Sequence, residues 1–177
     1  MCKKYELTRG IKKIKHALTR ETINLYCICA LKDFDDVKEG DLGGFIEKEA
    51  NLSHDGNCWV YDNACAYGHA RVSDNAKIRH YSQICGQVYG DCEVYGRAFI
   101  SQYANIYDNA CVYGNAHVYD YAHVSYDATV FGYARVYGRA IVAGSAHIHS
   151  YAEVYNYAFI NGRAQIYGKV YGGALVG

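Results

Sequence analysis

The sequence predicts an all-β protein built as a β-solenoid with a small N-terminal β cap. Three observations predict it. A six-residue unit recurs from Cys58 onward, each unit alternates small or aliphatic residues with polar or aromatic ones, and the segment 1–57 lacks the unit. Stacked copies of such a unit can bury an apolar face that one copy cannot bury alone. We therefore predict a capping region at 1–57 and a repeat region at 58–177.

The repeat unit predicts a short strand followed by a tight corner. Eighteen full units begin at 58, 64, 70, 76 and 82 and then at every sixth residue from 92 to 164. Position one is Ala in 15 units, position three is Val or Ile in 17, and position five is Gly, Asp or Asn in 14. Positions one and three share a parity, so both point to the same side of a strand. Gly, Asp and Asn tolerate the positive φ that a corner requires.

An aliphatic residue with a small residue four positions later resembles the hexapeptide repeat of left-handed parallel β-helices, as in Val94 with Ala98 and Val136 with Ala140. The resemblance implies a triangular coil of three units, or about 18 residues, and a left hand that spacing alone does not reveal. Shortened units at 88–91 and 170–173 each fit one side, so we expect six coils and a partial seventh, about 30 Å long. Segment 30–64 also resembles the leader of bacterial and prophage hexapeptide-repeat proteins, which are often labelled as transferases.

The capping region is more charged than the repeat region and contains its own strand pattern. Leu25–Leu31 predicts a strand, and Gly40–Gly44 predicts a turn before a short strand at Phe45–Ile46. The end of a solenoid exposes unpaired backbone groups, which a capping segment can cover. At the other end the chain stops within a repeat, so we expect a second subunit to cover it, in a dimer or trimer. The residues expected at this contact are Tyr171, Leu175 and Val176.

Residues one coil apart lie above one another, so position four sorts the outward side chains onto three faces. Two faces carry columns of aromatic residues, whereas the third is small and polar in its C-terminal half. Stacked Tyr columns stabilise the coils, and Tyr also suits interfaces because it combines a large rigid area with a hydroxyl group. The candidate partner-binding residues are Tyr95, Tyr113, Tyr119, Tyr121, Tyr133, Tyr137, Tyr151, Tyr155 and Tyr157.

Charge and composition argue against several other classes of protein. Lys and Arg number 18 and Asp and Glu number 18, so the net charge is zero, whereas a nucleic-acid binder is expected to be basic. No apolar run approaches the ~20 residues of a membrane span, and the N-terminus has no apolar signal core. We therefore expect a cytoplasmic protein without a nucleic-acid or membrane partner. The eight cysteines form no CxxC pair, which favours free thiols over a zinc site.

Catalysis is the main alternative, because the resemblance includes trimeric acyltransferases that bind an acyl donor between neighbouring coils and usually use a catalytic His. His117 and His123 occupy position two of adjacent units and are the alternative catalytic residues. A zinc carbonic anhydrase of the same fold gathers three His, for which His147 and His149 are weak candidates. No carboxylate or nucleophile is clearly paired with any of these residues, so we expect no metal and no cofactor.

These observations favour a non-enzymatic protein that binds a protein partner through its Tyr-rich faces. The prophage resemblance implies a phage-encoded inhibitor of a host factor, such as a component of antiviral defence. Two alternatives stay open: an acyltransferase-like enzyme, or a protein that sequesters a small nucleotide between subunits.

Overall fold

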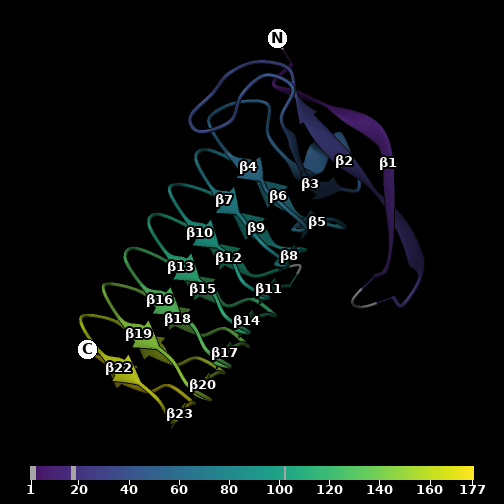
Figure 1. Cartoon of the computed structure of the whole chain (residues 1–177). Coiled ribbons are helices and arrows are strands. Elements are labelled where there is room, and N and C mark those ends of the chain that lie inside the picture. Colours follow the sequence, from purple (N-terminus) through teal and green to yellow (C-terminus); the bar gives the residue numbers. More distant parts are fainter. Residues whose placement is uncertain (1–2, 17–18, 102) are drawn as a thin grey trace.

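The protein forms a parallel β-solenoid with an antiparallel hairpin beside its N-terminal end (Figure 1). The computed structural model describes residues 3–16, 19–101 and 103–177. The described strands belong to three sheets that run along one axis, and the C-terminus lies at the end opposite the hairpin. The all-β solenoid predicted from the repeat is confirmed.

One sheet joins the N-terminal hairpin to the second face of the solenoid. Its strands, in spatial order, are β1 (Tyr5–Lys15), β2 (Thr22–Ala30), β3 (Leu42–Ile46), β5 (Cys65–Ala66), β8 (Gln83–Ile84), β11 (Phe99–Ile100), β14 (His117–Val118), β17 (Arg135–Val136), β20 (Glu153–Val154) and β23 (Lys169–Val170). The pairs β1–β2 and β2–β3 are antiparallel, and pairing is parallel from β3 onward. The expected strand at 25–31 overlaps β2 in all but its last residue, and the expected strand at 45–46 lies within β3.

The other two faces are purely parallel sheets. The first face consists of β4 (Trp59–Val60), β7 (Lys77–Ile78), β10 (Glu93–Val94), β13 (Cys111–Val112), β16 (Thr129–Val130), β19 (His147–Ile148) and β22 (Gln165–Ile166). The third face consists of β6 (Arg71–Val72), β9 (Gln87–Val88), β12 (Asn105–Ile106), β15 (His123–Val124), β18 (Ile141–Val142), β21 (Phe159–Ile160) and β24 (Leu175–Val176). A short 3-10 helix, η1 (Glu49–Asn51), precedes the first coil.

Strand register confirms the predicted coil length. Glu93 pairs with Cys111, and Cys111 pairs with Thr129, so one coil takes three full six-residue units. Lys77 pairs with Glu93, which is a shorter step along the chain and places the first shortened unit at β9. The second shortened unit likewise forms one side of a coil at β23.

The core is a narrow column of alanines and aliphatic residues. Between Val60 and Ile160, every residue at positions one and three is at most 2% exposed. Among the described residues, position five of the full units adopts positive φ except at Gly86 and Gly168, which precede the two shortened units; it does so even where it is His80 (61°), Tyr126 (55°) or Ser150 (61°). The inward positions and the corner position are therefore those that the repeat predicts.

Aspartates at the corners join successive coils. The backbone N–H of His80 donates to Asp62 Oδ2 over 2.9 Å, and that of Gly138 donates to Asp120 Oδ2 over 3.1 Å. Each bond links position five of one coil to position five of the next. Asp at this position therefore serves both the turn and the stacking.

The start of β1 closes the N-terminal end of the core. The Tyr5 hydroxyl donates to the Leu52 carbonyl over 2.8 Å, and its ring stacks on His54 with centroids 4.3 Å apart. Lys4 is fully buried, and its Nζ donates to the Cys58 carbonyl over 2.8 Å. Burial lowers the pKa of Lys4 because the ammonium loses its hydration.

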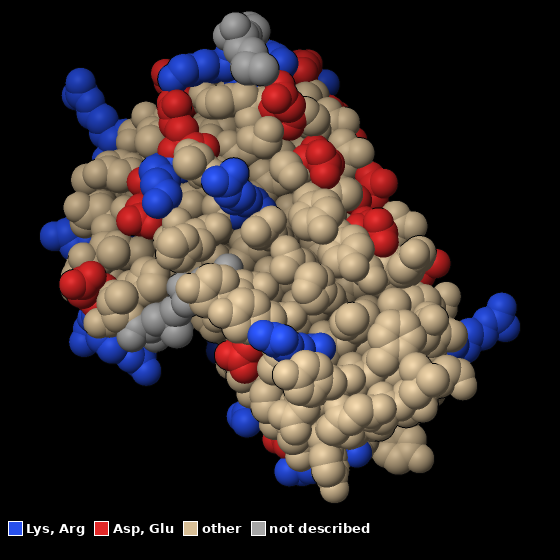
Figure 2. All heavy atoms as spheres, turned by 180° about the vertical axis from the view of Figure 1, so that it is seen from behind, with Lys and Arg blue, Asp and Glu red and all other residues tan. Residues whose placement is uncertain are grey.

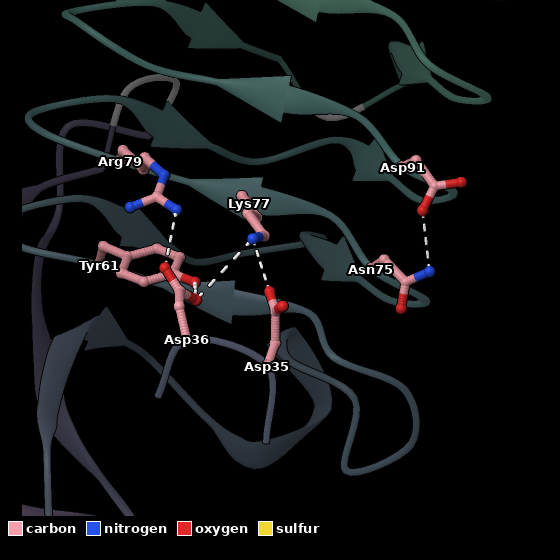
Figure 3. A network of polar contacts seen from close by, with 7 residues as sticks. All are labelled: Asp35, Asp36, Tyr61, Asn75, Lys77, Arg79 and Asp91. Atoms are coloured by element: carbon pink, nitrogen blue, oxygen red, sulfur yellow. Dashed lines mark hydrogen bonds and ion pairs between the residues drawn. The ribbon is translucent and has the colours of Figure 1, made fainter. Parts of the chain in front are cut away.

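The loop after β2 is fastened to the first two coils by a cluster of charges (Figure 3). Lys77 Nζ lies 2.5 Å from an Asp35 carboxylate oxygen, and Arg79 lies 3.3 Å from Asp36. The Tyr61 hydroxyl donates to Asp36, and this hydrogen bond holds the pKa of Asp36 below its usual range. The Arg79 guanidinium also lies 3.9 Å from the centre of the Tyr61 ring. These contacts hold the capping loop against the solenoid.

The described cysteines are all free thiols. They are Cys27, Cys29, Cys58, Cys65, Cys85, Cys92 and Cys111, and Cys2 lies outside the described residues. No helix within the described ranges is long and apolar enough to cross a membrane.

Candidate functional site

The second-face column is a continuous stack of tyrosine rings. Tyr119, Tyr137, Tyr155 and Tyr171 follow one another with centroids 4.8, 4.9 and 5.2 Å apart, and the first two pairs are within 3° of parallel. Because the rings stack along the solenoid axis, each inner ring presents only its edge and hydroxyl outward. Tyr119, Tyr137 and Tyr155 are half-buried, and burial raises the pKa of Tyr119 to about 12.

The first-face column has the same construction. Tyr95, Tyr113, Phe131 and His149 stack with centroids 4.8, 5.0 and 5.4 Å apart. All four side chains are half-buried. The predicted residues Tyr95 and Tyr113 therefore contribute ring edges to this face, as their counterparts do on the second face.

Four of the predicted tyrosines project at the corners and are much more exposed. Tyr133 and Tyr151 are 54% and 75% exposed and stack with centroids 5.1 Å apart. Tyr121 and Tyr157 are 53% and 65% exposed, and the Arg139 guanidinium lies between them at 5.9 and 5.8 Å from the ring centres. The corner tyrosines therefore offer the largest aromatic area to a partner.

A groove runs along the second face between the corner pair Tyr133–Tyr151 and the second-face column. It has a volume of about 420 Å³ and is lined by Asn115, His117, Tyr133, Arg135, Tyr151 and Glu153. His117, Arg135 and Glu153 occupy matching positions on successive strands β14, β17 and β20. We call this hollow the second-face groove. Sequence reasoning missed it because it sorted the faces by position four, whereas these three residues stand at position two.

The charges of the second-face groove are only partly paired. Glu153 lies 2.9 Å from Lys169, whereas Arg135 has no ion pair in the described part of the chain. The His117 side chain is exposed, and partial loss of hydration in the groove, together with the nearby Arg135 charge, lowers its pKa, which favours the neutral imidazole at pH 7. A neutral imidazole can accept a proton, which is the requirement for a general base.

The structure separates the two alternative catalytic histidines. His123 lies on β15 of the third face, where it pairs with Asn105 and Ile141, and its ring is edge-on to Tyr107 at 6.2 Å. His117 lies on the second face, so the two side chains form no common site. Among the described residues, no three His, Cys, Asp or Glu side chains gather in a way that could hold a metal ion.

The N-terminal end of the second face is covered by the hairpin, which corrects one part of the outward-tyrosine assumption. Tyr67 occupies position four of this face, where an outward ring is expected, but it is fully buried in a cluster with Leu25, Cys65 and Cys85. Its hydroxyl donates to Gln83 Oε1 over 2.9 Å. The physical reason is the apolar side of the β1–β2 hairpin, which no repeat pattern predicts. The open aromatic column of this face therefore starts at Tyr119.

The C-terminal coil leaves its outer edge unpaired within the described chain. β22, β23 and β24 each pair with a strand on one side only. Tyr171 and Leu175 are 59% and 78% exposed, and Val176 is half-buried. Contact of these residues with a second subunit stays a prediction.

Charged side chains are unevenly distributed over the surface. Seen from behind, Lys, Arg, Asp and Glu gather over the N-terminal part, while much of the surface farther along the solenoid is uncharged (Figure 2). The uncharged area agrees with the predominance of Tyr, Val and Ala in the later coils.

Comparison with known proteins gives one informative similarity. No protein-family model matches the chain. An Escherichia coli (strain K12) protein named "Uncharacterized acetyltransferase YdcK" is 42% identical over 78 residues, which are 44% of this chain and 24% of that protein. The matched part thus covers about a quarter of the length of this relative.

Proposed function

Because the chain is a hexapeptide-repeat β-solenoid protein, we propose that it is a binding protein whose second face docks a protein partner. The observation that carries the proposal is the set of exposed corner tyrosines, of which Tyr133 and Tyr151 are 54% and 75% exposed. Tyr combines large contact area with few rotatable bonds, so little conformational entropy is lost when it binds. Stacking of Tyr133 on Tyr151, with centroids 5.1 Å apart, restricts both rings before a partner binds.

Two arginines on this surface favour a partner with acidic side chains. Arg135 in the second-face groove lacks an ion pair in the described chain, and Arg139 is held between two tyrosine rings. Arginine flanked by tyrosines is typical of residues that dominate binding energy. A partner with acidic side chains placed among apolar ones would pair with the two arginines separately.

The partner we propose is a host protein that this chain inhibits, as the prophage resemblance implies. A second copy of the chain is proposed at the C-terminal coil, through Tyr171, Leu175 and Val176. Tyr171 is also the last ring of the second-face column, so the proposed contact with a second copy lies next to the proposed docking face.

The docking surface is tested by binding after substitution. The double variant Tyr133→Ser/Tyr151→Ser removes the most exposed stacked pair, and Tyr81→Ser is the matched control because Tyr81 is also a corner residue and is 60% exposed. A stoichiometric partner isolated from the host bacterium should bind the double variant at least tenfold more weakly and the control equally well. Equal affinity for all three proteins would refute the proposed surface. Circular dichroism of each variant verifies the fold.

Acyl transfer is a second candidate, favoured by the name of the E. coli relative and by the neutral His117 in the second-face groove. In this case His117 would accept a proton from the acyl acceptor, and Tyr133 and Tyr151 would border the site. The test is release of free thiol from acetyl-coenzyme A in the presence of amine acceptors. Activity that is lost in His117→Gln but kept in His123→Gln would support an enzyme. Activity that is absent, or equal in both variants, would refute this candidate.

A further inference from the structure

The third face carries a short aromatic column that ends above a hollow. Tyr89 and Tyr107 stack with centroids 5.3 Å apart and ring planes within 5° of parallel. In the next two coils position four is Ser125 and then Ala143, so the column lacks a ring at both levels. The hollow has a volume of about 510 Å³, within the range of small-molecule sites. The lining residues on which the argument rests are Tyr107, Ser125, Ile141, Ala143, Phe159 and Asn161.

The walls of this third-face hollow are apolar and uncharged. Ile141 and Phe159 stand at position two of successive coils and are both half-buried. Ala143 is 6% exposed and forms part of the floor. Position four alone makes this half of the face small and polar, as predicted from the sequence. Position two makes it largely apolar.

Two polar groups without protein partners face this apolar setting. Ser125 is 1% exposed, and its hydroxyl makes no hydrogen bond within the described part of the chain. The Ser125 side chain borders the hollow, so its hydroxyl is available to a molecule bound there. Asn161 has no side-chain hydrogen bond there either, and its Oδ1 lies only 2.6 Å from where a Cβ on Gly144 would be. Its carboxamide therefore leans across the hollow at Gly144.

We propose that the third-face hollow binds an uncharged planar ring with a polar edge, stacked on the face of Tyr107 opposite Tyr89 and beside the edge-on ring of His123. The ring would take the place that the column leaves empty at Ser125 and Ala143. Stacked aromatic groups prefer centroid distances of about 4.5–7 Å, and the columns of this protein repeat at 4.8–5.4 Å. Ile141 and Phe159 would cover one side of the ring.

The chemistry of the lining selects the ligand class. The Ser125 hydroxyl and the Asn161 carboxamide can each donate and accept a hydrogen bond, so they fit a ring that carries a hydroxyl or a ring nitrogen. No charged side chain lines the hollow, so a carboxylate or phosphate on the ligand would gain no ion pair. This site is on a different face from the docking surface proposed above, and its function is independent of that proposal.

The test fills the hollow with the residues that the column lacks. Ser125→Tyr/Ala143→Tyr would continue the stack below Tyr107, and both positions point outward, where other coils accept tyrosine. Ser73→Tyr is the matched control, because it extends the same column above Tyr89 and leaves the hollow open. Tyr107→Leu is a further variant that keeps apolar bulk but removes the stacking face. Circular dichroism and thermal unfolding verify the fold of each protein.

The probes are indole, p-cresol and adenine, with benzoate as the charged comparison, measured by saturation-transfer NMR and by calorimetry on the full chain. At least one neutral probe should bind the unmodified protein and Ser73→Tyr equally, bind the filled variant at least tenfold more weakly, and bind Tyr107→Leu several-fold more weakly. Indole or p-cresol as the preferred probe would indicate an aromatic side chain or metabolite, and adenine would indicate a nucleobase. Unchanged binding to the filled variant, no binding of any neutral probe at millimolar concentration, or tighter binding of benzoate would overturn the proposal.

Discussion

Gly138 lies at a corner where one coil stacks on the next, and replacing it with alanine measures what that close stacking contributes. Its φ is 71°, and a Cβ built there would lie 2.8 Å from the backbone nitrogen of Asn156. Gly172 has almost the same φ, 72°, but an added Cβ would meet nothing within 4 Å because Gly172 is in the last coil. The two glycines therefore share the same backbone strain and differ in the clash.

The expected loss of stability is larger for Gly138→Ala than for Gly172→Ala. The left-handed conformation costs a non-glycine residue about 1–2 kcal/mol, which is offset by about 0.4–1 kcal/mol because alanine has fewer unfolded conformations. Crowding a well-packed site adds about 1–3 kcal/mol. Gly138→Ala should therefore lower the free energy of unfolding by about 2–4 kcal/mol, and Gly172→Ala by about 1 kcal/mol or less.

A third variant tests whether a new hydrogen bond between coils can offset part of the stability lost when a side chain replaces Gly138. In the coil before Gly138, Asp120 Oδ2 accepts from the Gly138 N–H over 3.1 Å. Gly138→Asn would place a similar acceptor over the Asn156 N–H, and asparagine tolerates positive φ better than alanine does. We expect Gly138→Asn to lose less stability than Gly138→Ala.

Urea unfolding followed by circular dichroism gives the free energy of unfolding of each of the three variants. The comparison requires that the dependence of this free energy on urea concentration is the same in all of them. The expected order of stability is Gly172→Ala, then Gly138→Asn, then Gly138→Ala. Equal losses for the two alanine variants would mean that the coils have room to move apart, and the stacking account would be wrong. A Gly138→Asn variant less stable than Gly138→Ala would refute the proposed hydrogen bond.

Three further predictions concern the core, the second-face column and the cap. Val136→Asp should abolish the cooperative unfolding transition because it buries an unpaired charge at a position with 0% exposure, whereas Val136→Ala should cost about 2–3 kcal/mol by the same assay. The triple variant Tyr119→Ser/Tyr137→Ser/Tyr155→Ser removes three ring stacks worth about 0.5–1.5 kcal/mol each. The midpoint of its thermal unfolding should therefore fall, while its circular dichroism spectrum at about 25 °C stays native. Loss of the native spectrum would show that the column is needed for folding. Burial lowers the pKa of His54, so the unfolded chain binds more protons below about pH 6.5, and the free energy of unfolding should fall from pH 7 to pH 5, less steeply in His54→Phe. An unchanged slope in that variant would exclude His54 as the source.

The solenoid could be predicted from the sequence because its core depends on local spacing. Ala at position one and Val or Ile at position three recur every six residues, and a side chain that recurs at every unit has one environment throughout. The shortened side at β9 was also predictable, since Val88 follows Ile84 by four residues instead of six. The hairpin β1–β2 was not, because its packing over Tyr67 is a tertiary contact between segments that share no pattern.

The candidate sites were predictable only in part. The spacing of one full coil placed Tyr119, Tyr137 and Tyr155 in one column, and the structure confirms that they stack. Their exposure did not follow from spacing, because a ring within a column is covered by its neighbours whereas a ring at a corner, such as Tyr151, is not. Both hollows escaped notice because each is formed by position-two residues together with the corner or position-four residues beside them.

In a solenoid, the residues that can specify a ligand are those that depart from the repeat. The inward residues of this protein are nearly uniform, and outward substitutions away from special contacts change stability little, so the outer surface can vary while the fold persists. The protein also shows what happens to an aromatic residue whose role is structural: Tyr67 is covered by the hairpin and fully buried. The hairpin could not cover Tyr133 and Tyr151 without extending along the later coils, and these side chains stay exposed. The solenoid departs from its repeat in two ways that its stability does not require. Tyr133 and Tyr151 stack and yet stay exposed, and the third-face column lacks rings at Ser125 and Ala143. For that reason the binding functions that we propose are assigned to these positions and not to the repeat itself.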